Sequence, residues 1–219
     1  MMNSKYIYLS YFLNKNTPLY GGNKGIKVNS LSEIKKGDSS NTKQITLNNH
    51  SGTHIDFPNH FIDNGKVSNN YDANFWIFNT PFLLEYNTAQ NEIIEISDTL
   101  LSCVPKDVDF LIIKTGFYKY RYEEKYWNYN PGISPEMASK LRQKFPLLKV
   151  LGFDFISLTS YQNRLLGRKA HKEFLGDNEI LLVEDMDLSV LKKTPLKIMC
   201  FPLQVENIDG APVNIIAEL

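Results

Sequence analysis

The chain has 219 residues, enough for one substantial hydrophobic core and few for two complete domains. Its 24 Lys and Arg residues balance its 24 Asp and Glu residues, so no net charge favours nucleic acid or an anionic membrane as a partner. Its two cysteines do not resemble the framework of a disulfide-stapled secreted protein. We therefore expect a single domain over residues 1–219.

The first apolar segment, IYLSYFL at residues 7–13, is too short to span a bilayer, and no small-residue cleavage site follows it. We interpret it as part of a first strand and not as a signal peptide. This interpretation predicts a cytoplasmic protein that does not bind a membrane.

Runs of apolar and β-branched residues that are bounded by turn-forming residues predict strands along the whole chain. They lie at residues 6–13, 42–47, 82–86, 110–114, 149–155, 180–183, 196–201 and 213–217. Many strands with helices between the later ones predict an α/β fold with a mixed sheet.

The clearest helix signal begins at Ser134-Pro135-Glu136, where an N-cap residue precedes a proline and an acidic residue. Met137, Leu141 and Phe145 then repeat at four-residue spacing and give the helix one apolar face. Shorter helices are predicted over residues 118–127 and 169–175.

Three of the four histidines fall within eleven residues, in the segment HSGTHIDFPNH that contains His50, His54, Asp56 and His60. A helical zinc motif does not fit, because Gly52 and the nearby Thr and Pro residues are poor helix formers and no Glu follows His50. If the strand at 42–47 continues, its period of two instead places His50, His54 and Asp56 on one face. Polar loop residues are the alternative, but this spacing favours a metal site for zinc, manganese or iron.

Residues four apart in a flat strand lie about 13 Å from each other, which is too far for both histidines to bind one ion at about 2.1 Å. Either the chain kinks, most naturally at Gly52, or the site holds two ions. Further ligands must come from elsewhere. The remaining histidine, His171, lies in a predicted helix, and Glu184 follows the predicted strand at 180–183, where functional carboxylates often project.

The segment HSGTHIDFPNH resembles the signature of the putative cyclase family, which includes bacterial kynurenine formamidases and isatin hydrolases. The resemblance extends over nearly the whole chain through shorter segments. These are TPLYGG at residues 17–22, FIDNGK at 61–66, LIIKTGF at 111–117, PGISP at 131–135, GFDFIS at 152–157 and DGAPV at 209–213.

The resemblance implies a swivelling β/β/α fold that assembles as a homodimer or homotetramer. It further implies that one or two divalent ions, zinc first and manganese as the alternative, are bound by a set of five side chains: His50, His54, Asp56, His171 and Glu184. His60 matches the acid/base histidine of the family, and Tyr20 matches an aromatic residue that borders the substrate.

We therefore expect a metal-activated water to hydrolyse a small amide, most simply an N-formyl arylamine, with His60 as acid and base. Tyr20, with Phe57 and Phe61 as further candidates, would stack on the substrate ring. A cyclic amide such as isatin is an alternative substrate. The same residues could also serve a lyase or isomerase, or a purely structural metal site.

Overall fold

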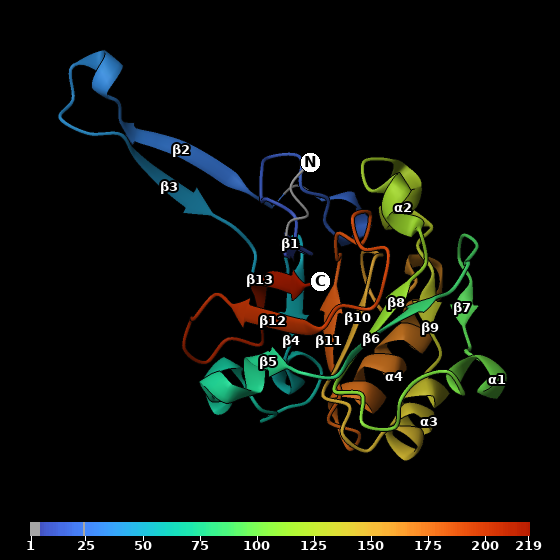
Figure 1. Ribbon diagram of the computed structural model, residues 1–219. Helices are drawn as coiled ribbons and strands as arrows, with labels where there is room; N and C mark the ends of the chain where they lie inside the picture. The colour runs from blue at the N-terminus through green and yellow to red at the C-terminus, as the bar shows by residue number, and fades with distance from the viewer. Residues whose placement is uncertain (1–4, 24) are drawn as a thin grey trace.

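Strands from both halves of the chain meet in one mixed sheet in the computed structural model, which describes residues 5–23 and 25–219 (Figure 1). Within these residues the sheet has nine strands. In spatial order they are β5 (Ile77–Phe78), β12 (Lys197–Pro202), β13 (Gly210–Glu218), β4 (His54–Asp56), β11 (Leu181–Glu184), β10 (Val150–Phe153), β8 (Phe110–Lys114) and β6 (Pro81–Glu85), and β1 (Tyr6–Tyr8) also pairs with β13.

The sheet divides into a parallel half and an antiparallel half. Strands β6, β8, β10 and β11 run parallel to one another. The three inner strands β8, β10 and β11 are almost continuously buried, as in Phe110–Ile113. Strand β4 is antiparallel to both of its neighbours, β11 and β13. The short β4 is therefore enclosed on both edges by strands from the last third of the chain.

Four α-helices occur in the described residues: α1 (Asp98–Leu101), α2 (Glu124–Asn128), α3 (Glu136–Lys144) and α4 (Arg164–Leu175). Helices α3 and α4 pack against each other, and α4 also contacts β11 (Figure 1). Their apolar faces, which include Leu141 and Phe174, are buried in the core. None of the described helices has the length and apolar character needed to cross a bilayer.

The connections contain short 3-10 helices and two further pairs of strands. The 3-10 helices are η1 (Tyr20–Gly22), η2 (Ile34–Lys36), η3 (Pro58–His60), η4 (Ser68–Asn70), η5 (Ala73–Trp76), η6 (Phe117–Tyr120) and η7 (Tyr161–Asn163). Strands β7 (Ile93–Ile94) and β9 (Gly132–Ile133) pair in parallel. Strands β2 (Lys27–Ser32) and β3 (Thr42–Thr46) form an antiparallel ribbon that projects from the body (Figure 1).

This architecture confirms the predicted α/β class and the mixed sheet. All eight predicted strands have a counterpart, but the first one ends at Tyr8 and not at residue 13. The reason is that the backbone leaves β13 after Leu9, and the amide of Tyr11 donates to the Thr53 hydroxyl instead. Helix α4 begins at Arg164, five residues before the predicted start at 169.

A buried ion pair fixes the loop that follows β11. The Arg121 guanidinium donates through Nε and Nη2 to the Asp185 carboxylate at 2.8 and 2.7 Å, and both side chains are 2% exposed. The Tyr126 hydroxyl donates to the same carboxylate at 2.5 Å. Asp185 directly follows Glu184 and has a positive φ of 52°. The pair therefore holds the chain in an unusual conformation at the end of β11.

We expect Arg121→Met to lower the free energy of unfolding by about 3–5 kcal/mol, because it leaves the buried Asp185 carboxylate without its cation. Urea denaturation followed by circular dichroism measures this loss. Arg121→Met/Asp185→Asn should recover part of it, since Asn is neutral and tolerates a positive φ. A double variant no more stable than Arg121→Met alone would contradict this explanation.

Candidate metal centre

Strand β4 carries two of the predicted ligands, and the turn before it carries a third. His54 and Asp56 alternate along β4, so their side chains leave the same face. The strand predicted at 42–47 does not continue to Asp56: β3 ends at Thr46, and the backbone turns at Gly52 with φ 65°. The kink at Gly52, one of the two alternatives that the spacing left open, is thus present.

Because of the turn at Gly52, the His50 side chain lies beside β4, the strand that follows it in the sequence. Its Nδ1 lies 2.9 Å from Asp56 Oδ1. On the neighbouring strand, Gly210 is the register partner of Asp56, and a Cβ at Gly210 would lie 2.3 Å from His50 Cε1. The missing side chain of Gly210 therefore provides the space for the imidazole of His50.

The second half of the chain supplies the other two predicted ligands. Glu184 is the last residue of β11, as predicted, and lies opposite His54 in the antiparallel register. His171 projects from α4 and is 2% exposed. The structure thus brings the five predicted metal ligands together, and we call them the donor cluster: His50, His54, Asp56, His171 and Glu184.

Four distances in the donor cluster are equal. His54 Nε2 lies 3.5 Å from Asp56 Oδ1 and 3.5 Å from Glu184 Oε2. His171 Nε2 lies 3.5 Å from Asp56 Oδ2 and 3.5 Å from Glu184 Oε1. Two ligands about 2.1 Å from a tetrahedral ion lie about 3.4 Å apart. The spacing and the donor types therefore fit a divalent cation, and each carboxylate offers its two oxygens to different histidines.

The backbone and neighbouring side chains orient these donors. His54 Nδ1 is 2.8 Å from the Gly52 carbonyl oxygen, and His171 Nδ1 is 2.9 Å from the Gly167 carbonyl oxygen. Because a carbonyl only accepts, each Nδ1 carries a hydrogen, and Nε2 is the nitrogen that each ring turns to the centre. The amide of Leu158 donates to Glu184 Oε1 at 2.7 Å and fixes the carboxylate.

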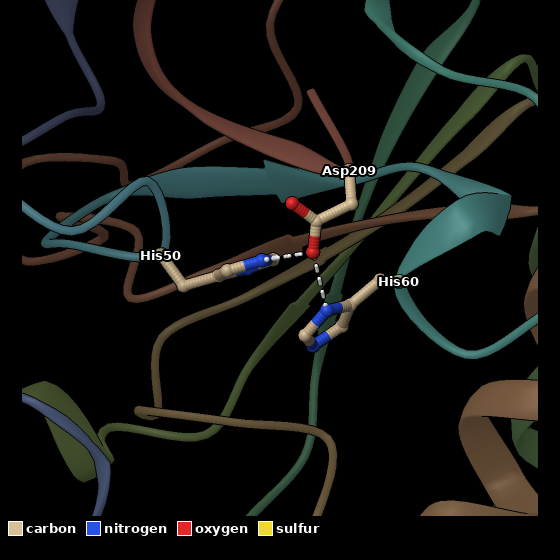
Figure 2. Close-up of side chains that lie close together, drawn as sticks. All are labelled: His50, His60 and Asp209. Atoms are coloured by element: carbon tan, nitrogen blue, oxygen red, sulfur yellow. Dashed lines mark hydrogen bonds and ion pairs between the residues drawn. The ribbon is translucent and has the colours of Figure 1, made fainter. Parts of the chain in front are cut away.

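His60 lies beside the donor cluster and interacts with Asp209 (Figure 2). His60 Nδ1 and His50 Nε2 approach the same oxygen, Asp209 Oδ2, at 2.9 and 3.0 Å. The two imidazole rings are stacked with centroids 3.9 Å apart. With Nδ1 held by the carboxylate, Nε2 of His60 is free to exchange a proton with a bound molecule.

Asp209 has a role at the site that we did not assign from the sequence. It lies in the DGAPV segment, which we quoted only for the family resemblance. The available signal was its position immediately before an apolar strand, the same kind of signal that identified Glu184 after one. The pairing of β13 with β4 was not predicted, and only that pairing shows that Asp209 reaches His50 and His60.

The electrostatic environment differs between the histidines. Burial lowers the pKa of His50, but the Asp56 and Asp209 carboxylates outweigh it and raise this pKa to about 9. Burial also lowers the pKa of His171, but the Asp56 and Glu184 carboxylates outweigh it and raise this pKa to about 9. Burial lowers the pKa of His60 and His50 adds to this effect, while the Asp56 and Asp209 carboxylates oppose it without reversing it. His60 is therefore neutral near pH 7 and can accept a proton.

A cavity of about 250 Å³ opens over the donor cluster. Tyr20 borders it, and burial raises the pKa of the Tyr20 hydroxyl to about 12. Phe61 also lines the cavity and stacks on His171 with ring centroids 4.3 Å apart. Phe57, our other candidate for a substrate contact, is fully buried and packs against Tyr71. The prediction for Phe57 is wrong, because its side chain leaves the opposite face of the chain from Asp56.

Comparisons with known proteins agree with the fold. The chain is 28% identical over 214 residues to a kynurenine formamidase of Geobacillus thermodenitrificans, covering 98% of this chain and 97% of the relative. It is 25% identical over 197 residues to cyclase-like protein 2 of Arabidopsis thaliana, covering 84% and 67%. The structure of isatin hydrolase A from Labrenzia aggregata has a TM-score of 0.80 at 18% identity, covering 97% and 92%.

The family model described as "Putative cyclase" matches residues 7–159. This range includes His50, His54, Asp56 and His60, whereas His171, Glu184 and Asp209 lie beyond it. Because the match spans more than half of the chain, the protein belongs to the putative cyclase family.

Proposed function

We propose that this protein is a metal-dependent hydrolase of small amides and that an N-formyl arylamine is its substrate. The observation that carries the proposal is the set of four 3.5 Å distances between imidazole nitrogens and carboxylate oxygens in the donor cluster. Zinc is our first choice of metal and manganese the alternative, since both accept imidazole and carboxylate ligands. Asp56 and Glu184 each place one carboxylate oxygen near His54 and the other near His171, and this arrangement supports a centre with two ions.

The similarity to a kynurenine formamidase supports the substrate class, because that enzyme covers almost the same length as this chain. The fold shared with isatin hydrolase A makes a cyclic amide the alternative. In both cases a carbon–nitrogen bond of an amide is cleaved. An N-formyl arylamine would release formate and a separate amine, whereas the ring of a cyclic amide would open and its amine would stay attached to the new carboxylate.

A divalent ion at the donor cluster would supply Lewis-acid chemistry, which polarises the amide carbonyl and acidifies a water. In this proposal, His60 takes the proton of the attacking water at Nε2 while Asp209 holds Nδ1. The protonated His60 then returns the proton to the departing amine. Tyr20 and Phe61 form the walls against which the aryl ring lies.

We also propose that the protein assembles as a homodimer or homotetramer. The β2–β3 ribbon exposes Val28, Leu31 and Ile45 to solvent, with exposed fractions of 47%, 65% and 61%. An isolated two-stranded ribbon with exposed apolar side chains is marginally stable in water. Contact with a second copy of this chain would cover these side chains.

The proposed function is tested by metal analysis and a hydrolysis screen on N-formylkynurenine, formanilide and isatin. We expect His60→Ala to retain its metal and fold while kcat for the preferred amide falls about 10²–10⁴-fold, the usual contribution of a positioned acid/base. The loss should fall mainly on kcat, because the missing proton transfer belongs to the transition state.

Two results of this experiment would count against the proposal. Loss of the metal from His60→Ala would make His60 a ligand and not the base. Absence of hydrolysis of all three amides by the metal-loaded wild-type protein would reject the amide hydrolase itself.

Asp56→Ala should lose most of the bound metal, because Asp56 offers oxygens to histidines on both sides of the donor cluster. Inductively coupled plasma mass spectrometry of the purified variant measures the metal content per chain. Asp177→Ala is the matched control, since it removes an exposed carboxylate away from the site. Equal metal content in the two variants would remove Asp56 from the centre.

Leu31→Ser/Ile45→Ser should shift the protein toward monomers in light scattering after size-exclusion chromatography. The substitutions remove apolar side chains that we expect to be covered by a second copy. The matched control is Leu165→Ser, at an apolar residue on α4 that is 81% exposed. A monomeric wild-type protein, or an unchanged mass of the ribbon variant, would rule out the ribbon as the contact.

A further inference from the structure

Two arginines of α4 line the cavity over the donor cluster. Arg164 and Arg168 lie one helical turn apart, and His171 follows on the same side of the helix, so all three border the cavity. The seven residue steps from Arg164 to His171 span about 10 Å along the helix. Arg168 and then Arg164 therefore lie at increasing distance along the helix from His171.

Arg164 contacts aromatic residues, Tyr161 through its ring and Tyr20 electrostatically, but neither arginine has a carboxylate partner among the described residues. Both side chains are exposed at the cavity. The other two arginines are engaged: Arg121 binds Asp185, and Arg142 donates to the carbonyl oxygens of Pro146 and Asn178.

The carboxylates that border the same cavity have other partners. Glu184 accepts from the Leu158 amide and faces the histidines of the donor cluster, and Asp185 is held by Arg121. These acids therefore do not neutralise Arg164 and Arg168. A positive region therefore remains beside the donor cluster.

The placement of Arg164 is unfavourable for the helix itself. Arg164 is the first residue of α4, whose first turn contains no acidic residue. Cations near a helix N-terminus oppose the helix dipole. Arg164 is also positioned, since its guanidinium lies 5.0 Å from the centroid of the Tyr161 ring. Helix stability does not explain a cation here, whereas recognition of an anion in the cavity does.

We propose that Arg164 and Arg168 bind a carboxylate of the substrate, which makes the preferred substrate an anionic aryl amide. This inference rests on the proposed amide hydrolysis. Planar guanidinium groups match carboxylates through paired hydrogen bonds. The acid group lies on the leaving half of the substrate, several bonds from the amide, while the amide carbonyl lies at the donor cluster.

The test compares 4-formamidobenzoate with its methyl ester, which has nearly the same shape and no charge. For the metal-loaded protein, Arg164→Gln/Arg168→Gln should lower the ratio of kcat/KM for the acid to that for the ester by about 10- to 100-fold. The change should lie mainly in KM, because the arginines bind ground state and transition state alike.

The matched control is Lys169→Gln/Lys172→Gln, which removes the same charge from residues of α4 that do not line the cavity. This control should leave the acid-to-ester ratio within about threefold of wild type, as expected for solvent-screened surface charges. An equal fall of the acid-to-ester ratio in both double variants would mean that the overall positive charge of the helix causes the preference. That result would overturn the proposal.

Binding of the product 4-aminobenzoate and of its methyl ester, measured by isothermal titration, decides the inference independently of turnover. We expect the acid to bind wild type about 10-fold more tightly than it binds Arg164→Gln/Arg168→Gln. Acid binding unaffected by the arginine substitutions would overturn the proposed subsite. Absence of turnover with arginine-dependent binding would instead reject amide hydrolysis and leave the carboxylate subsite in place.

Discussion

The antiparallel pairing of β4 with β11 and β13 is the constraint on which the whole centre depends. It sets Glu184 opposite His54 and Gly210 opposite Asp56. Because side chains alternate along a strand, a shift of the register by one residue would turn every donor on one of these strands to the other face. The pairing of β4 with its two neighbours therefore determines which side chains form the donor cluster. The apolar strands β10 and β8 continue the sheet beyond β11 and fix its position.

Two adjacent acidic residues, Glu184 and Asp185, are buried at the end of β11, next to this strand pairing. Glu184 and Asp185 are 3% and 1% exposed, and such groups are costly to bury without partners. Glu184 points to the histidines and Asp185 to Arg121, so the chain sends two neighbouring charges to separate compensating groups. The arginine is thus part of what keeps the end of β11 in place, although it touches none of the donors.

The sequence predicted the parts of the site that local patterns encode. The spacing from His50 to His60 identified a candidate metal-binding segment, and the strand before Glu184 identified a carboxylate at a strand end. The sequence did not reveal Asp209, because it contacts His50 across 159 residues through a strand pairing that no local pattern specifies. The β2 strand was missed for a different reason: its residues, KVNSLS, are exposed and lack the apolar signal that burial imposes.

The order of the elements along the chain has a consequence for how the centre comes into being. Asp56 and Glu184 are separated by more than half of the chain, and β13, the other neighbour of β4, follows later still. During synthesis at about 5–20 residues per second, the first histidines would precede their partners by on the order of ten seconds. A nascent chain thus exposes single imidazoles and carboxylates, and high-affinity coordination becomes available only when the last strands have entered the sheet.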